Sequence, residues 1–449
     1  MRLMSPMDSI WLLLESPDTP MHFGTLMIFS PPAGSPGDFV ETLVGRMRSA
    51  RDVRAPWNQQ LASGPFGQRL PALREDPHID VDHHFRYLAV PPPGGRRELM
   101  DVVCRLHSRP LDFDRPLWEC HLIGGLEDDR FAIYTKIHHG LLDGGSASRL
   151  LFGMLSRSPR TRNMVPMWAI APPEQSNNAP NDQLRTQRPS RFRASVQSLG
   201  SLLAGSLAVP YTDPPNILRE GLTAPRDISF REFDLAQFKY VAKLADCTVN
   251  DLVLYVCSSA LRRFLEERSC LPDRPLTVAV PVNLRSAGDE RLGNALAQLY
   301  VNLATNVADP IDRLQAIKRS VAAAKTQLEA VPERARMLQT LAVTAPYMLG
   351  MVAGLGGHAP APYSLNISNV PGPPAPLYFN GARMESLVPL SFLMHGGALI
   401  VICTSYAGKL VLAITAAREQ LPEFDDIGDH LDDAFEEISR LFTETETAR

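Results

Sequence analysis

The alternation of apolar and polar positions predicts a chain built from interleaved strands and helices. In the first third, alternating or β-branched residues predict strands over 21–31 and 131–137. Apolar residues at helical spacing predict helices over 36–50, 96–107 and 146–156. This mixture is typical of an α/β or α+β protein, and α/β is the class that we expect.

The second part of the chain shows the same mixture. Thr248 to Asp251 has the capping-box pattern of a helix start, and this helix should reach about residue 268. Two apolar runs flank Ala407-Gly408, so a hairpin is predicted there. The other elements predicted in this part are the strands 228–233 and 276–281, the helices 312–328 and 422–442, and the hairpin strands 398–406 and 409–415.

A polar segment rich in proline, asparagine and arginine separates the two parts. Residues 157–193 show little periodicity, which is typical of a flexible linker. A chain of 449 residues is also long for a single compact domain. We therefore predict an N-terminal half over 1–156, a linker over 157–193 and a C-terminal half over 194–449.

Charge and cysteine content indicate a cytoplasmic protein that does not bind nucleic acid. The formal charge of −4 gives no reason to expect a nucleic acid as partner. None of the six cysteines forms a CxxC pair, which indicates reduced thiols in a cytoplasmic protein. The N-terminal apolar run from Ile10 to Leu14 is too short for a signal peptide, and Asp8 and Glu15 flank it.

The motif that carries chemistry is His138-His139, followed by Asp143 and Gly144. Alternation along the strand that ends here places the two imidazoles on opposite faces, so one can reach a cavity while the other packs behind it. Neutral imidazole is the side chain best suited to accept a proton from a hydroxyl near pH 7. Asp143 also fits the N-cap of the next helix, a role compatible with holding the loop. The motif points to activation of an alcohol or amine for attack on an activated acyl group.

Other catalytic patterns are weaker or missing. His78, Asp80, Asp82 and His84 would share one face of a strand. Four ligands in a row do not converge on one ion, so we interpret this segment as a polar surface strand and expect no metal site. The sequence has no HExxH metal motif, no Gly-x-Ser-x-Gly elbow, and no Walker or dinucleotide-binding glycine loop.

Seven motifs occur in one order and carry a family resemblance. They are Met4-Ser-Pro-Met-Asp8, Pro20-Met-His22, Leu106-His-Ser-Arg-Pro-Leu111, Pro116-Leu-Trp-Glu119, the His138 to Gly144 motif, Asn250-Asp251-Leu-Val-Leu254 and Ile367-Ser-Asn-Val-Pro-Gly-Pro373. Together they resemble the bacterial wax ester synthases/acyl-CoA:diacylglycerol acyltransferases over essentially the whole chain. The HHxxxDG element alone is shared across the wider CoA-dependent acyltransferase superfamily, which includes chloramphenicol acetyltransferase and peptide-synthetase condensation domains.

The resemblance implies an α/β fold of two chloramphenicol acetyltransferase-like subdomains. Each would be a mixed sheet flanked by helices, with an active-site tunnel at their interface. The implied activity is transfer of a long-chain acyl group from acyl-CoA to a fatty alcohol or a diacylglycerol, with no cofactor and no acyl-enzyme. His139 would be the general base. Both substrates partition into lipid, so we expect a cytoplasmic protein held peripherally on a membrane or lipid-droplet surface.

Further roles follow from the same resemblance. Asp143, next to Gly144, would point away from substrate and hold the loop through an ion pair with Arg285. Two departures from the family pattern, Asn283 in Pro281-Val-Asn-Leu-Arg285 and Ala297, concern local substrate contacts rather than the chemistry.

Other motif residues have structural explanations that compete with functional ones. Trp118 fits a core position better than a chemical role. Asn250 and Asp251 open a helix, so capping is their first explanation. Ser368 and Asn369 would lie on a strand that faces the cleft and contact pantetheine or stabilise the oxyanion.

Residues 337–357 form the most membrane-like segment of the chain. Leucine, methionine and valine are frequent there, but polar residues, Pro346 and several glycines interrupt the run. A transmembrane helix is purer and ends in charged or aromatic anchors. We expect a buried or lipid-facing helix that either lines a long acyl pocket or belongs to the core between the halves.

Two alternatives stay open at this point. The acceptor could be an amine or a small alcohol, or a substrate could be carrier-bound. A lipid-binding scaffold without catalysis is a different class, and the intact His138, His139 and Asp143 argue against it. The residues leave open the choice between fatty alcohol and diacylglycerol, the acyl chain length, the groups that hold the CoA phosphates and the oligomeric state.

Overall fold

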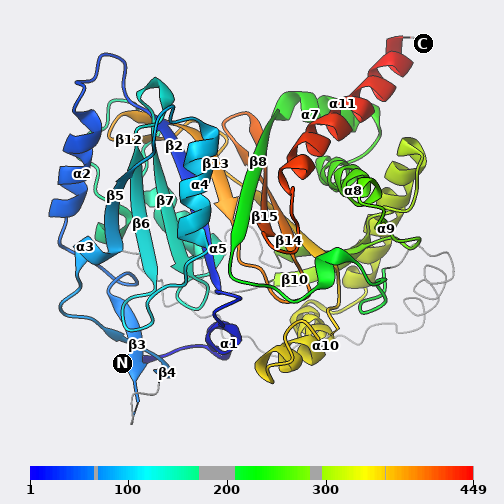
Figure 1. Ribbon diagram of the computed structural model, residues 1–449, viewed down its shortest axis with the longest axis horizontal. Coiled ribbons are helices and arrows are strands. Elements are labelled where there is room, and N and C mark those ends of the chain that lie inside the picture. Colours follow the sequence, from blue (N-terminus) through cyan, green and yellow to red (C-terminus); the bar gives the residue numbers. More distant parts are fainter. Residues whose placement is uncertain (65–68, 171–207, 284–295, 359, 448–449) are drawn as a thin grey trace.

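The computed structural model describes the chain except for residues 65–68, 171–207, 284–295, 359 and 448–449. Two six-stranded sheets with their helices form the two sides of the molecule (Figure 1). Both sheets mix parallel and antiparallel pairs, as the expected α/β class with two mixed sheets requires. A third, three-stranded sheet near the N-terminus consists of β1 (Arg2–Leu3), β4 (Arg69–Glu75) and β3 (Gln59–Ser63).

The first sheet carries the histidine motif at one edge. Its order is β12 (Tyr378–Phe379), β13 (Ala382–Leu390), β2 (His22–Ser30), β7 (Phe131–His138), β6 (Trp118–Gly124) and β5 (Phe85–Ala89). The strands predicted over 21–31 and 131–137 are β2 and β7. One face packs against α2 (Phe39–Ser49) and α5 (Gly144–Gly153), the other against α4 (Arg96–His107). All three helices were predicted within a few residues of these bounds.

Two strands of the first sheet come from the second part of the sequence. β13 pairs antiparallel with β2, from Arg383 opposite Ser30 to Leu390 opposite Gly24. The domain boundaries predicted from the sequence do not anticipate that β12 and β13 join the first sheet, because periodicity indicates a strand but not the strand with which it pairs. The first sheet is therefore completed by a segment about 350 residues downstream of β2.

The N-terminal half also extends further along the sequence than predicted. Residues 157–170, expected as the start of a linker, are described, and Trp168 within them is fully buried. Its Nε1 donates to the Ala50 carbonyl at 2.9 Å, and its ring stacks on Trp118. The rest of the predicted linker lies outside the described residues.

The second sheet has helices on its outer face. Its order is β10 (Leu296–Asn302), β9 (Thr277–Asn283), β11 (Leu365–Pro371), β14 (Leu399–Tyr406), β15 (Lys409–Ala417) and β8 (Arg226–Asp234). One large core joins it to α7 (Leu235–Leu244), α8 (Val249–Glu267), α9 (Pro310–Glu329) and α11 (Asp425–Thr447). The predicted strands 228–233 and 276–281, the hairpin and the helices 248–268, 312–328 and 422–442 correspond to β8, β9, β14, β15, α8, α9 and α11, whereas α7 and β10 were not predicted.

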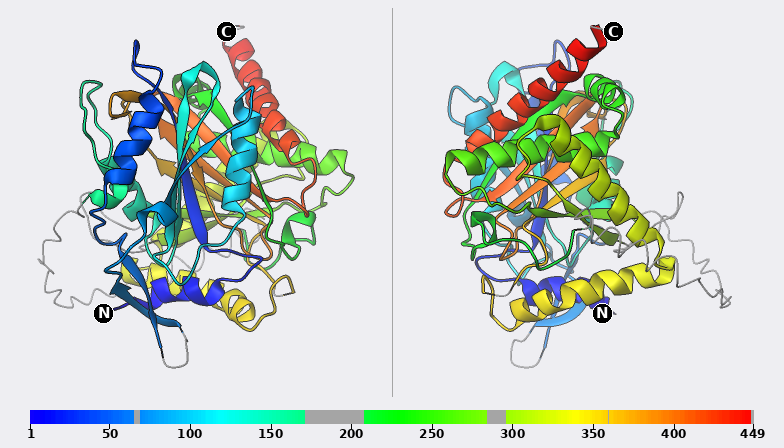
Figure 2. Two further views of the ribbon diagram at one scale, coloured as in Figure 1. Left: turned by 60° about the vertical axis from the view of Figure 1, so that its left-hand side comes forward. Right: turned by 90° about the vertical axis from the view of Figure 1, so that its right-hand side faces the viewer.

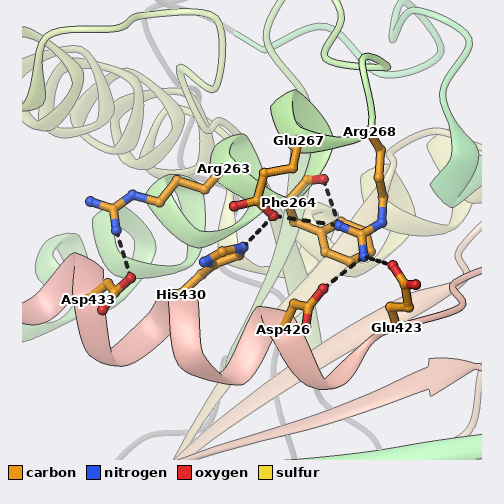
Figure 3. Close-up of polar contacts among 8 residues, drawn as sticks. All are labelled: Arg263, Phe264, Glu267, Arg268, Glu423, Asp426, His430 and Asp433. Carbon is orange, nitrogen blue, oxygen red and sulfur yellow. Dashed lines mark hydrogen bonds and ion pairs between the residues drawn. The ribbon is translucent and has the colours of Figure 1, made fainter.

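Helix α11 lies against α8 through apolar contacts and a row of ion pairs (Figure 3). Arg268 donates to Glu423 and Asp426 at 3.0 Å each, and its guanidinium lies 3.7 Å from the centre of the Phe264 ring. Arg263 donates to Asp433 at 3.2 Å. The C-terminal helix is thus oriented by paired charges as well as by burial.

The two halves meet through a shared apolar core. Residues of β2, β7, β13 and α4 pack there against β8 and β15 of the second sheet. The inner face of the second sheet changes character from one side to the other. It is apolar and buried at Phe230 and Ala413, but partly exposed and polar at Gln298, Tyr300 and Asn366.

The segment around His84 differs from the polar surface strand predicted for it. Asp80 accepts hydrogen bonds from the backbone N–H groups of Asp82 and His83 and so caps a short helix, α3 (Val81–His84). His84 is buried, and its ring stacks on Trp118 at 4.5 Å. The strand prediction was wrong because a local cap outcompeted the extended backbone.

Residues 333–352 form helix α10 (Glu333–Val352), which lies beside α1 (Pro6–Leu14) at one end of the molecule (Figures 1 and 2). No single helix of the described residues has both the length and the apolar content needed to cross a membrane.

Candidate active site

The His138-His139 motif lies at an edge where three strands of the first sheet end or begin. β7 ends at His138, which pairs with His22 at the start of β2. β13 ends at Leu390 beside the same part of β2. Phe392, two residues further on, therefore reaches this edge from the second part of the sequence.

His138 is fully buried, and its contacts assign its tautomer. Nδ1 accepts a hydrogen bond from the Gly140 N–H at 2.9 Å, which leaves the ring proton on Nε2. Nε2 is 3.4 Å from Oε2 of Glu15, and the same oxygen accepts from the Met21 N–H. The Met21 carbonyl in turn accepts from the His139 N–H at 2.9 Å. Glu15 thus connects the end of α1, the start of β2 and His138.

His139 keeps part of its surface exposed and is surrounded by aromatic rings. The ring centres of Trp11, Phe392 and Phe23 lie 4.3, 5.5 and 5.7 Å from that of His139. Burial among them lowers the pKa of His139 to about 4, although the Asp143 carboxylate acts in the opposite direction. The imidazole is therefore neutral at physiological pH, the form that can accept a proton.

Gly140 allows α1 to approach the motif closely. A Cβ atom at this position would lie 3.0 Å from Nδ1 of His138 and 3.1 Å from the backbone oxygen of Asp8 in α1. Any larger residue would push the helix away from the loop. The absence of a side chain here brings Trp11 of the same helix onto His139.

Asp143 caps helix α5. Its Oδ1 accepts from the Ser146 N–H at 2.8 Å and its Oδ2 from the Ser146 hydroxyl at 3.0 Å. Gly144, the first helical residue, is exposed, with open space around its Cα. Arg285, predicted to pair with Asp143, lies outside the described residues, so that pairing stays a prediction.

Trp118 lies in the core of the first half, as its size suggested. It is fully buried, its Nε1 donates to the Trp57 carbonyl at 2.7 Å, and its ring contacts Trp57, Trp168 and His84. Its contacts support the sheet behind the motif and do not include His139.

Asn250 and Asp251 lie in the first turn of α8. Asp251 is buried, and its Oδ2 accepts from both the N–H and the hydroxyl of Thr248, at 3.0 and 2.7 Å. The Asp251 N–H in turn donates to the Thr248 hydroxyl oxygen at 3.1 Å. This reciprocal pair is the capping box expected from the sequence.

Ser368 and Asn369 lie on opposite faces of β11, because side chains alternate along a strand. Ser368 is paired with Ile402 and shares the partly exposed inner face with Asn366. Asn369 has the orientation of the core residue Ile367 but is exposed near the end of the strand. Ser368 is the one of the two that faces the inner side of the sheet.

Four residues of the site were not anticipated from the sequence: Trp11, Glu15, Phe23 and Phe392. The opening motif pointed to the N-terminal segment, but its spacing does not reveal that α1 covers the histidine loop. Phe392 follows a strand whose partner lies far away in the sequence. Only the three-dimensional pairing of β13 with β2 brings it to His139.

The described residues show neither a metal-binding cluster nor a cysteine thiol of lowered pKa. They include no group of three or more His, Cys, Asp and Glu side chains placed to hold a metal ion. Burial raises the pKa of the Cys104 and Cys403 thiols to about 12, so these do not form thiolates near neutrality. The neutral imidazole of His139 is the group suited to proton transfer.

Two mixed sheets face each other, and the histidine motif lies at an inner edge between them. This architecture is that of the condensation-domain fold. The first condensation domain of the CDA synthetase has the same fold. It superposes with a TM-score of 0.56 at 15% identity, over 98% of this chain and 96% of that domain.

The chain belongs to the wax ester synthase/diacylglycerol acyltransferase family. The model of the catalytic domain of this family matches residues 4–253, and that of the C-terminal domain matches 292–439. The O-acyltransferase WSD of Acinetobacter baylyi is 34% identical, with 96% of each chain covered. The wax ester synthase/diacylglycerol acyltransferase of Marinobacter aquaeolei VT8 superposes with a TM-score of 0.81 at 33% identity, over 99% of this chain and 100% of that one. The protein is an O-acyltransferase.

Proposed function

We propose that this enzyme transfers a long-chain acyl group from acyl-CoA to the hydroxyl of a fatty alcohol or a diacylglycerol, with His139 as general base. The names of its relatives support both acceptors. The observation that carries the assignment to His139 is its position. It is the histidine of the motif that keeps exposed surface, whereas His138 is buried against Glu15.

Reaction by direct transfer needs one proton acceptor. The His139 imidazole takes the proton of the acceptor hydroxyl as its oxygen attacks the thioester carbonyl. The tetrahedral intermediate then expels the CoA thiolate, which receives that proton from the imidazolium. A thioester is already activated, so positioning supplies much of the remaining rate, and no acyl-enzyme is formed.

The aromatic rings around His139 suit this chemistry. An apolar surrounding disfavours the imidazolium in the free enzyme, so the base is ready before substrate binds. The same rings of Trp11, Phe23 and Phe392 offer an apolar surface to the chain of a lipid acceptor.

The choice of substrate also bears on where the enzyme works. Long-chain alcohols and diacylglycerols reside in membranes and lipid droplets, so we propose that the protein associates peripherally with a lipid surface. Acyl-CoA can reach the enzyme from water.

A panel of acceptors tests the proposal. Purified protein is given radiolabelled palmitoyl-CoA with hexadecanol, with diolein, or with small amines, and CoA release and labelled product are measured. We expect ester products, and His139→Ala should lower their rate by about 10²- to 10⁴-fold. The exposed His78→Ala is the matched control and should keep the wild-type rate.

Each contrary outcome points to a different correction. Amide products alone would assign the enzyme to another acceptor class. Failure of the wild type to release CoA with any alcohol would favour a lipid-binding scaffold. Full activity of a folded His139→Ala protein would remove the general base from the proposed mechanism.

A further inference from the structure

The leucines of helix α10 face outward, and its buried side chains among the described residues, Thr344 and Tyr347, carry hydroxyl groups, unlike those of an ordinary surface helix. Leu338, Leu341, Ala345, Leu349 and Val352 recur at helical spacing and form one exposed face. Among the large side chains, Leu349 is 68% exposed and Leu338 is 66% exposed. In water such a face has no favourable partner.

The inward side of α10 uses polar groups to hold the helix on the protein. The Tyr347 hydroxyl donates to the His395 carbonyl, and the Tyr211 hydroxyl donates to the Val343 carbonyl at 2.6 Å. The Thr340 hydroxyl oxygen accepts from the Gln298 N–H at 3.4 Å. The helix is therefore anchored in this orientation, and its leucines cannot turn inward without breaking these bonds.

The outward face adjoins the proposed active site through α1. The two helices lie side by side at one end of the molecule in every view (Figures 1 and 2). On α1, Trp11 contacts the His139 ring, and Leu13, two residues later, is 65% exposed. One short helix thus connects the exposed apolar surface with the proposed general base.

The charge pattern identifies the partner of this surface. No Asp, Glu, Lys or Arg occurs from residue 337 to 357, a run of 21 positions in a chain with 21% charged residues. A protein partner would be met by a polar rim, whereas the interior of a lipid leaflet admits only uncharged side chains. Since hydrogen bonds hold the inward side of α10 on the protein, only its outward apolar face can enter the leaflet, as in a helix that lies in the membrane interface.

We infer that the outward face of α10, together with Leu13 of α1, is the surface by which the enzyme docks on a phospholipid bilayer. The inference rests on the proposed function, because a bilayer is where the lipid acceptor resides. Docking on this face places α1 at the membrane and shortens the path of the acceptor to His139. Because the face is uncharged, detergent should release the protein from the bilayer and high salt should not.

Vesicle binding in the absence of substrate tests this surface. The full chain is mixed with phosphatidylcholine vesicles, and the bound fraction is measured by flotation. Leu338→Glu/Leu349→Glu should weaken the partition coefficient by about a hundredfold, since each buried leucine is worth roughly tenfold or more. Glutamate is as good a helix former as leucine, so the melting temperature should stay unchanged.

The control carries the same two charges at the opposite end of the molecule. Tyr240→Glu/Leu441→Glu alters exposed residues of α7 and α11 and should bind vesicles like the wild type. Vesicle binding is measured without substrate. A failed acceptor assay would therefore contradict the proposed function but not the membrane-docking surface. A second readout compares rates with hexadecanol in vesicles and with dissolved hexanol, and only the first should fall in the α10 variant.

Three outcomes would overturn the inference. The wild type could fail to float with the vesicles, or both double variants could bind equally well. The wild type could also prove to be a dimer that the α10 variant converts to a monomer, in which case the face is a subunit interface.

Discussion

The acid–base behaviour of His139 follows from the three rings that surround it. Trp11, Phe23 and Phe392 remove water without supplying a hydrogen bond to the charged form. The carboxylate of Asp143 favours the charged imidazolium, but burial outweighs it. The residue is thus held as a base of low proton affinity, which releases its proton readily to the leaving thiolate.

This environment predicts the pH dependence of the reaction. Activity requires the neutral imidazole, and the pKa of His139 lies at about 4 instead of 6.5. The acid limb of kcat/KM for acyl-CoA should therefore fall well below pH 6, because protonation begins to compete only there. A rate profile from pH 4.5 to 8 measures it, and an inflection near 6.5 would contradict the aromatic environment described for His139.

Glu15 should act as a positioning residue. Glu15→Ala removes the carboxylate that accepts the hydrogen bond of the Met21 N–H and lies 3.4 Å from His138 Nε2, so α1 and Trp11 lose their fixed place over His139. We expect kcat to fall at least about tenfold, because charge-assisted hydrogen bonds are worth roughly 1.5–3 kcal/mol. Glu15→Gln should be milder, since its amide oxygen still accepts from Met21.

The comparison variant is Glu419→Ala, which removes an exposed carboxylate far from Glu15 in the sequence. It should leave kcat and KM unchanged. Equal activity of Glu15→Ala and wild type, with an unaltered melting temperature, would show that the contact between Glu15 and His138 has no role in turnover.

At the scale of elements, the sequence predicted single segments well and their partners poorly. The helix opened by Thr248 and the strand that ends at His138 follow from local capping and alternation. The cap formed by Asp80 is equally local, but the alternating polar residues around it led to the prediction of a strand instead of a helix. The pairing of β13 with β2 is not encoded in any local pattern, so the placement of Phe392 had to come from the structure.

The polar contacts between α8 and α11 make a prediction at this scale. Arg268→Ala removes three ion pairs, with Glu267, Glu423 and Asp426, and the contact with the Phe264 ring (Figure 3). Each exposed pair and the cation–π contact are worth up to about 1 kcal/mol, so the free energy of unfolding should fall by about 1–2 kcal/mol. Urea denaturation measures the loss.

Arg383→Ala provides the contrast, because the Arg383 side chain is 55% exposed and its guanidinium lies 3.9 Å from the carboxylate of Glu385. Its effect should stay within about 0.5 kcal/mol. Equal stability losses for the two variants would mean that the pairs of Arg268 contribute nothing specific to the docking of α11.

For the whole molecule, buried histidines should make the fold sensitive to acid. Burial lowers the pKa of His84 to about 4 and that of His107 to about 3. Between these values and 6.5 the unfolded chain binds protons that the folded chain does not, so stability falls as the pH falls. At pH 5 each residue should cost about 2 kcal/mol relative to pH 7.5.

Urea unfolding at the two pH values measures this effect, with m-values compared to confirm that the same transition is observed. A free energy of unfolding that stays constant from pH 7.5 to 5 would mean that these rings are protonated as easily in the folded protein as in the unfolded chain.

The pairing of β13 with β2 has a consequence for folding during synthesis on the ribosome. Strand β2 is made within the first 30 residues, but its neighbour β13 ends only at Leu390 of a 449-residue chain. Until then, β2 has an unpaired edge that can pair with the wrong strand. Completion of the N-terminal sheet is therefore delayed until almost nine-tenths of translation has passed, and a fragment truncated at the apparent midpoint should aggregate.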